Sequence, residues 1–342
     1  MLFVKINFKG PIMVVLANLI QRDQYAMEVL RASIRKSVFW QSGLIVNDME
    51  LTRLMQANVG STFMFDYYND LADNEGRISD DSATVATTDG ITTGSDVAIG
   101  NYRNRSWGAR NITANLSATG DPLQAIAGRI GAYWARQMDT TAIAVVNGII
   151  AGNAANNAGD MINNKTTVAI DLPMVVDTKQ TAGDAQDFFG AMICHSAIKT
   201  SLVKQGIVDK IYDAQGNFLY ESFIGLRLVV TDSVPTGTQI PGGVAGDYLS
   251  YIVGTGMFGY GEGKPKLPNE VFYQPATGNG AGEETLWSRK NFCIHPYGFS
   301  FKPTATFPAS TSPTNAEFAD VTAWARNVER KRVPFAALIS KA

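Results

Sequence analysis

The spacing of apolar and polar positions changes several times along the chain and predicts different elements in turn. Residues 12–56 mix charges with apolar side chains at helical spacing, which predicts an N-terminal arm with short helices. Residues 61–68 form a short apolar run that is typical of a strand. Residues 77–112 follow with few large apolar side chains, so this segment cannot bury a core of its own. The pattern predicts a polar extension between apolar elements.

This polar segment nevertheless carries the residues of a β-hairpin. Threonine and β-branched residues are frequent in 84–88 and 91–93, and Asp89-Gly90 between them suits the positive φ angles of a tight turn. A two-stranded ribbon without a third partner is marginally stable in water. We therefore expect 77–112 to find its packing partner on another copy of the molecule, which indicates an assembling protein.

A long helix is predicted next. Asp121 is placed to cap it, Pro122 suits its first turn, and apolar residues then keep helical spacing until Gly152, where the helix is expected to end. At 1.5 Å per residue, such a helix would be about 45 Å long. Residues 152–167 are rich in Asn, Gly and Ala and are interpreted as a linker.

The remainder of the chain alternates strands and helices. An α/β middle is predicted from strands at 191–194, 226–231 and 248–253 and a helix at 196–205. The chain is expected to close with a strand at 291–301, a helix at 315–326 and a last strand at 333–339. The fold class expected from this order of elements is α+β.

Composition narrows the classes of function. Hydrophobic residues make up 45% of the 342 positions, which is enough for a sizeable core. Charged residues are only 18%, below the roughly 25% of typical soluble domains, so less surface should face water in the working state than a monomer would show. The net charge of −2 lacks the basic footprint of a tight nucleic-acid binder. Any contact with DNA should be weak and without sequence preference.

Three motifs suggest chemistry, and each has a simpler explanation. The stretch 254–259 matches the spacing of a dinucleotide-binding loop, but glycines and prolines follow where a helix N-terminus would have to bind pyrophosphate. Cys194-His195 and Cys293-Ile294-His295 invite a zinc site or a Cys/His nucleophile, but neighbours on a strand point to opposite faces and no CxxC spacing exists. We expect packed strand residues at these positions and no catalytic residue, cofactor or metal site.

The polar segment is also acidic. Residues 61–112 hold eight carboxylates and four arginines but no lysine. A solvated acidic surface is the simpler interpretation, and charge complementarity with a basic stretch of a neighbouring subunit is the sharper one. The candidates for inter-subunit contact are Asp80, Asp81, Asp89, Arg103, Arg105, Trp107, Arg110, Arg31, Arg35, Arg330 and Arg332.

Several longer stretches resemble the major capsid (coat) protein of tailed bacteriophages, in the branch typical of siphophages of Gram-positive hosts. The resemblance runs from Gln41 to Pro334, and the stretches that carry it are 121–136 (DPLQAIAGRIGAYWAR), 146–150 (VNGII), 218–222 (FLYES), 286–289 (LWSR), 295–299 (HPYGF) and 312–316 (SPTNA). It implies the α+β fold of tailed-phage major capsid proteins. The implied segments are an N-terminal arm (1–56), an extended β-hairpin loop (57–114), a peripheral domain with a spine helix (115–155), an α/β axial domain (156–286) and peripheral C-terminal strands and helix (287–342).

The resemblance also implies a function and a set of partners. The protein would be a structural subunit, not an enzyme, that self-assembles into hexamers and pentamers of an icosahedral head around double-stranded DNA. In that family the extended loop lies across an adjacent subunit. Because 61–112 lacks lysine, the isopeptide link that some members form from a loop lysine is not expected. The other implied partners are a separate scaffolding protein, a portal protein, weakly bound DNA and, in some phages, decoration proteins, in a virion assembled in the bacterial host cytoplasm without a membrane partner.

Three alternatives stay open at this point. An encapsulin-like cargo shell protein would have a similar fold. A nucleotide-binding enzyme would use Gly254 to Gly259 as its phosphate loop. A secreted β-rich surface protein would require cleavage after Ala17, where Val15-Leu16-Ala17 resembles a signal-peptidase site.

Overall fold

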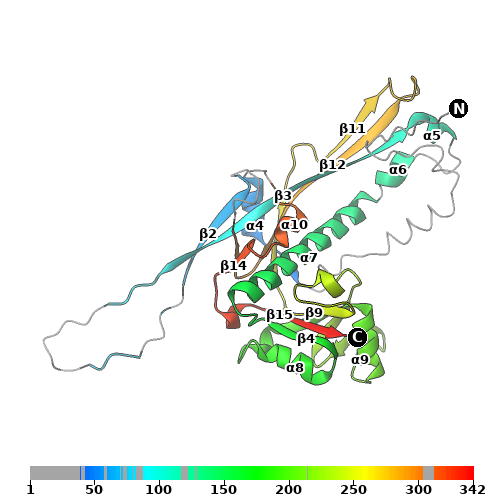
Figure 1. Ribbon diagram of the computed structural model, residues 1–342. Coiled ribbons are helices and arrows are strands. Elements are labelled where there is room, and N and C mark those ends of the chain that lie inside the picture. The colour runs from blue at the N-terminus through cyan, green and yellow to red at the C-terminus, as the bar shows by residue number, and fades with distance from the viewer. Residues whose placement is uncertain are drawn as a thin grey trace.

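Two large β-sheets and one long helix are the main elements of the chain that the structure describes (Figure 1). The computed structural model describes residues 39, 43–57, 60–69, 71, 75–79, 81, 88–116, 122–127, 129–213, 215–302 and 312–342. Most of the predicted N-terminal arm, with its signal-peptidase-like site, lies outside these residues. The mixture of helices and sheets confirms the expected α+β class.

The first sheet has six strands and includes the C-terminal part of the polar segment 77–112. Its strands run in the order β1 (Ile45–Asn47), β10 (Phe258–Gly263), β12 (Glu283–Pro296), β3 (Thr93–Arg110) and β2 (Thr62–Tyr68), with β11 (Asn269–Gln274) also paired to β12. Helix α4 (Met49–Gln56) packs on this sheet through buried Leu51 and Met55. Asp48 caps the helix by accepting hydrogen bonds from the amides of Glu50 and Leu51 at 2.8 and 3.3 Å.

Strand β3 changes partners along its length. Residues 100–110 pair antiparallel with β12, from Gly100↔Cys293 to Arg110↔Glu283, whereas residues 93–99 pair with β2. The expectation that all of 77–112 needs a partner on another molecule is therefore wrong for the inner part of this segment. Strand β12 supplies that partner from far along the chain, where no local pattern could reveal it.

The second sheet has seven strands. They run in the order β4 (Ile162–Ala169), β15 (Phe335–Lys341), β9 (Asp247–Gly254), β5 (Phe189–Cys194), β8 (Leu226–Val230), β7 (Phe218–Phe223) and β6 (Asp209–Tyr212). The pairs β4–β15 and β5–β8 are parallel and the others are antiparallel. Helices α8 (Leu172–Gln180) and α9 (Ser196–Lys204) pack on it through buried Val175, Ile198 and Leu202. The predicted α/β middle is confirmed in β5, β8, β9 and α9.

Helix α7 (Ile130–Asn156) connects the two sheets. It has 27 residues and is about 40 Å long. Near its start, the Trp134 indole Nε1 donates to Ser288 Oγ of β12 at 2.9 Å. Its C-terminal half is mostly buried in a core cluster that includes Tyr251 of β9 and Phe335 of β15. The helix therefore acts as the spine that the sequence predicts.

The ends of this spine differ from the prediction. The expected single helix is two, because α6 (Pro122–Ala127) precedes α7; Asp121 lies outside the described residues. Gly152 does not end the helix. A Cβ there would lie 3.2 Å from the Val321 carbonyl oxygen, so this glycine serves close packing. The predicted linker at 152–167 is wrong, since α7 occupies its beginning and β4 most of its end.

The C-terminal region forms shorter elements than predicted. The expected strand 291–301 is divided by a turn at Gly298 (φ +80°) into the end of β12 and β13 (Phe299–Phe301). The expected helix 315–326 is only α10 (Asn315–Phe318), and β14 (Trp324–Arg326) follows and pairs with β13. The last strand is confirmed as β15. The remaining short helices in the described ranges are α5 (Asn111–Leu116) and the 3-10 helices η1 (Gln186–Phe188), η2 (Gly237–Gln239) and η3 (Arg330–Arg332).

The two sheets cross the domain boundaries expected from the sequence. Strand β15 comes from the segment 287–342 but lies in the seven-stranded sheet. Strands β10 and β11 come from the segment 156–286 but lie in the six-stranded sheet. The assignment of segments to peripheral and axial positions within a capsomer stays a prediction.

Candidate assembly interface

The β2–β3 ribbon ends in a long excursion, which we call the outer loop (residues 69–92). Asn69 and Thr92 close its base: the Asn69 amide donates to the Thr92 carbonyl at 2.8 Å, and Asn69 Nδ2 donates to Thr92 Oγ1 at 3.0 Å. In Figure 1 the described parts of the loop project to the left from the ends of β2 and β3, away from the seven-stranded sheet. The outer loop therefore includes the first part of the polar segment 77–112 and the residues just before it. It is the part of the chain that extends from the body.

The predicted tight turn at Asp89-Gly90 is wrong. Neither residue has a positive φ angle, and the ribbon strands stop at the pair Tyr68↔Thr93. The two residues lie instead on one limb of a wide loop. Asp89 connects this limb to the other, because Arg77 Nη2 lies 3.2 and 3.3 Å from the two Asp89 carboxylate oxygens. Both side chains are largely exposed, so this ion pair contributes little to the stability of the monomer.

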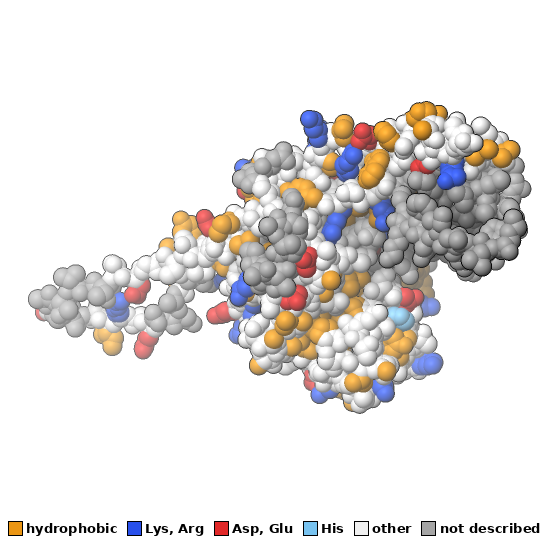
Figure 2. Space-filling view, turned by 45° about the horizontal axis from the view of Figure 1, so that its top comes forward, with side chains coloured by type: hydrophobic (Ala, Val, Ile, Leu, Met, Phe, Trp, Pro, Cys, Tyr) orange, Lys and Arg blue, Asp and Glu red, His pale blue; other side chains and the backbone are white. Residues whose placement is uncertain are grey.

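Large apolar side chains lie exposed along the outer loop and the neighbouring ribbon. Ile78 is 93% exposed, Leu71 is 70% exposed and Ile91 is 53% exposed. Met64 and Tyr68 on β2 are exposed as well. Apolar orange side chains are visible along this projection in Figure 2. A row of exposed apolar residues on a thin extension is the kind of surface that marks a contact with another protein.

The candidates on β3 divide into internal and exposed residues. Arg103 Nη2 donates to the Pro313 carbonyl oxygen, and burial lowers the pKa of Arg103, opposed by the nearby Glu317. Trp107 packs edge-on against Tyr133 of α7 with ring centroids 5.2 Å apart. These two side chains therefore contact their own chain.

The other two arginines of β3 differ from each other. Arg105 is exposed, and Arg110 is half-buried opposite Glu283 in the ladder, with its Nε lacking a hydrogen-bond partner. Of these two, only Arg105 presents its side chain openly to solvent.

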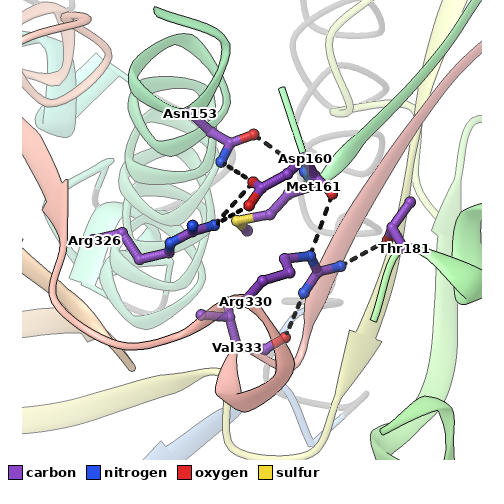
Figure 3. A network of polar contacts seen from close by, with 7 residues as sticks. All are labelled: Asn153, Asp160, Met161, Thr181, Arg326, Arg330 and Val333. Atoms are coloured by element: carbon purple, nitrogen blue, oxygen red, sulfur yellow. Dashed lines mark hydrogen bonds and ion pairs between the residues drawn. The ribbon is translucent and has the colours of Figure 1, made fainter. Parts of the chain in front are cut away.

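Arg330 lies in an internal polar network (Figure 3). Its guanidinium donates to Thr181 Oγ1 at 2.7 Å, to the Val333 carbonyl at 3.0 Å and to the Asp160 carbonyl at 3.4 Å. Burial lowers the pKa of Arg330 to about 10. Asp160 also accepts two bonds of 2.8 Å from Arg326 Nη1. Arg330 thus holds η3 against the start of the seven-stranded sheet, and its donors are engaged within the chain.

The remaining candidates stay predictions. Asp81 lies exposed on the outer loop, and Arg332 lies exposed on η3. Asp80, Arg31 and Arg35 are outside the described residues. The charge complementarity expected between the acidic loop and these basic residues is untested by the geometry of one chain.

The motifs that suggested chemistry occupy ordinary structural positions. Residues 254–259 form the turn between β9 and β10, with Gly256 at φ +77°, and a strand follows where a dinucleotide site needs a helix. This turn therefore lacks the geometry that the nucleotide-binding alternative requires. Cys194 and Cys293 are buried in different sheets, and burial raises the pKa of each thiol to about 12. Within the described ranges, no cluster of three His, Cys, Asp or Glu side chains could hold a metal ion.

His195 caps a helix. Its Nδ1 accepts from the Ala197 amide at 3.1 Å at the start of α9. His295 was grouped with Cys293 in the sequence, but its Nε2 lies 3.0 Å from Asp96 Oδ2. Sequence reasoning missed this contact between residues almost 200 positions apart, and no local signal could have found it.

No helix in the described part of the chain has both the length and the apolar character to cross a membrane.

Comparison with known proteins gives three consistent results. The family model described as Gp13-like, major capsid protein 13-like, matches residues 60–333. The major capsid protein of Bacillus phage SPP1 is 32% identical over 312 residues, which cover 89% of this chain and 91% of that protein. This agreement favours a phage head over an encapsulin-like shell.

Solved structures show the same fold at low identity. The capsid of cyanophage Pam1 matches with a TM-score of 0.58 and 10% identity, over 90% of this chain and 93% of that one. The capsid of a native GTA particle matches with a TM-score of 0.50 and 15% identity, over 90% and 92%. The family match, the curated relative and this shared fold lead to one conclusion: the chain belongs to the Gp13-like family of major capsid proteins and is a structural subunit of the icosahedral head of a tailed phage.

Proposed function

We propose that the outer loop of each subunit lies on a neighbouring subunit, and that hexamers and pentamers joined in this way close into a shell around double-stranded DNA. The observation that carries the proposal is the exposure of Leu71, Ile78 and Ile91 on a loop that projects from the body. These three side chains are each more than half exposed to solvent. A neighbour would remove them from water, at about 25 cal/mol for each Å² of apolar surface buried.

The fold explains why the contact falls at this place. The inner part of β3 is already paired with β12, so it needs nothing from another subunit. The outer loop begins where both ribbon strands have ended, and its described residues form neither strand nor helix. Ordering such a segment costs conformational entropy, which contacts with a second copy can offset.

The other features of the proposal follow from charge and family. A nearly neutral chain suits a container that holds DNA by weak, non-specific contact. A structural role without catalysis, assembly in the bacterial host cytoplasm, and a scaffolding protein, a portal protein and decoration proteins as partners are expectations that the family resemblance supports.

Charge supports the docking of the loop in a second way. The loop carries Asp80, Asp81 and Asp89 and is acidic overall, whereas Arg31, Arg35 and Arg332 are basic candidates on a neighbouring copy. Reversing two charges at once, Asp80→Lys with Asp81→Lys, is expected to impair assembly and to leave the thermal melt of the subunit unchanged. Normal shell yield from this variant would argue against electrostatic docking of the loop.

Shortening the loop tests the docking itself. Because Asn69 and Thr92 are paired at the base of the loop, residues 70–91 can be replaced by Asn-Gly, which closes a two-residue hairpin without changing the body. The variant is expected to unfold in urea like the parent and to form no closed shells by negative-stain electron microscopy.

A loop of unchanged length provides the matched control. Replacing 70–91 by a Gly/Ser segment of equal length separates the chemistry of the loop from its length. We expect this variant to fail in assembly as well, because its apolar and acidic side chains are gone. Shells of parental yield from the Asn-Gly variant would overturn the proposal.

A further inference from the structure

The ribbon leaves the body at a sharply defined point. The ladder between β3 and β12 ends at Gly100↔Cys293. Beyond this pair β12 continues to Pro296 alongside β10, while β3 pairs with β2. The main-chain ladder that holds β3 to the body therefore stops at Gly100, and side chains must provide any further hold.

Three such contacts lie just beyond that point, on three consecutive residues of β3. The Ser95 carbonyl accepts from Asn327 Nδ2 at 3.3 Å. Asp96 Oδ2 lies 3.0 Å from His295 Nε2. The Val97 amide donates to Ser300 Oγ at 2.9 Å. They come from β12, from β13 and from the segment after β14, so separate parts of the body converge on the base of the ribbon.

The pair Asp96–His295 is shielded from water and held in place. The two side chains are only 16% and 11% exposed. Asp96 Oδ1 accepts from the Val97 amide at 2.9 Å, which fixes the carboxylate. Phe65 stands opposite Asp96 in the β2–β3 ladder, and its ring centroid is 6.1 Å from that of His295. Burial and these contacts hold the two side chains in place, whereas an exposed pair would be screened by solvent.

The imidazole depends on Asp96 for its orientation. His295 Nδ1 is buried without a hydrogen-bond partner, so Nε2 makes the only polar contact of this ring within the described part of the chain. A buried polar pair is weak evidence for stability, because desolvation offsets much of its attraction. It is better suited to selecting one arrangement among several of similar energy.

We propose that Asp96 and His295 are positioning residues that set the direction in which the ribbon and the outer loop leave the body. A two-stranded ribbon has little stiffness of its own and twists readily. Contacts at its base therefore decide the direction in which it leaves the body. A small change of that direction moves the tip of the outer loop by a larger distance. In a shell, this direction determines which part of a neighbour the outer loop reaches.

A distance measured within one chain tests this without requiring that the loop dock on a neighbour. Spin labels on Thr93→Cys at the ribbon and Ala155→Cys on α7, diluted with unlabelled protein, report the angle of the ribbon to the body. The native thiols should react little, because burial raises the pKa of Cys194 and Cys293 to about 12. We expect one narrow distance distribution in the parent, and a shifted and broadened one in His295→Leu.

Two further variants make the result specific. His295→Gln keeps a donor that can reach Asp96 and should restore the parental distribution. If His295 only filled space, His295→Gln would instead behave like His295→Leu. Arg289 lies on β12, like His295, but away from the base of the ribbon. Arg289→Gln breaks its ion pair with Glu270 of β11 and should leave the distribution unchanged. Superimposable distributions in the parent and His295→Leu would overturn the proposal. If urea unfolding shows that His295→Leu does not fold, Asp96→Ala, which removes the acceptor of the His295 hydrogen bond, is judged by the same criterion.

Discussion

The two parts of the polar segment around β3 both have few large apolar side chains but differ in their surroundings. Residues 100–110 lie beside β12 and near α7, and Trp107 packs on Tyr133 there. The outer loop also has few large apolar side chains, but it projects away from the body with Ile78 almost fully exposed. The comparison shows that a polar stretch is held in its own subunit where distant strands flank it. Where they do not, the stretch projects into solvent, and we propose that another copy holds it.

The largest effect is expected in the body, at Gly148 of α7. A Cβ there would lie 2.1 Å from the Phe318 carbonyl oxygen, which also accepts the Trp324 indole N–H at 3.0 Å. Gly148→Ala should therefore displace α10 and lower the free energy of unfolding by about 2–3 kcal/mol. Urea unfolding measures the loss, and shell assembly should fall with it.

The same helix provides the control. Gly131 is exposed and has open space where a Cβ would lie. Gly131→Ala should raise the free energy of unfolding by about 0.5–1 kcal/mol, because alanine is the better helix former. Equal effects of the two substitutions on the free energy of unfolding would contradict the close contact between α7 and α10.

A matched pair of truncations compares the two parts of the segment directly. Trp107→Ala removes a half-buried ring from the inner part and should cost about 1–2 kcal/mol of unfolding free energy, less than for a fully buried ring. Ile78→Ala removes a side chain that is 93% exposed and should change that free energy by less than about 0.5 kcal/mol. Shell yield should nevertheless fall for Ile78→Ala. A destabilised Ile78→Ala monomer would contradict the division into a self-supporting part and an unsupported one.

The smallest effect is local and depends on pH. In the turn between β6 and β7, the amides of Asn217 and Gln215 and the Asn217 side chain donate to Asp213, which lowers the pKa of that carboxyl below its usual value. The contribution of the Asp213 carboxylate to the stability of this hairpin is therefore present above the unfolded-state pKa of about 4. It is lost as pH falls through the lower folded-state pKa. The protection of this hairpin's amides against hydrogen exchange, taken relative to their intrinsic rates, should fall selectively in acid, and Asp213→Ala should remove this pH dependence. An unchanged pH dependence in that variant would assign it to another group.

The sequence predicted the elements that local periodicity determines. Strands such as β5 and β9 are almost continuously buried and read clearly as apolar runs, and the spacing along α7 indicated its long helix. The sequence did not predict that β12 would flank β3, or that β15 would join the sheet of β9, because pairing over such distances leaves no local trace. Gly152 was misread for a related reason: its role is set by Val321, a residue distant in sequence.

The candidates for inter-subunit contact stay predictions, and the sequence could not show which of them bind their own chain. The exposed apolar side chains of the outer loop lie in the segment that the sequence singled out. Charge alone could not show that Arg103 and Arg330 are engaged within their own chain, because the Pro313 carbonyl and the Thr181 hydroxyl that bind them come from other parts of the sequence. The pair Asp96–His295 was missed for the same reason, since its two strands meet only in the folded protein.

Reconstruction of an assembled shell by electron cryomicroscopy tests the central claim most directly, because it traces residues 69–92 in the presence of all neighbours. We predict continuous density for this loop along the surface of an adjacent subunit, with Leu71, Ile78 and Ile91 covered by it. Density that places the loop against its own subunit, with these three side chains buried there, would contradict the account.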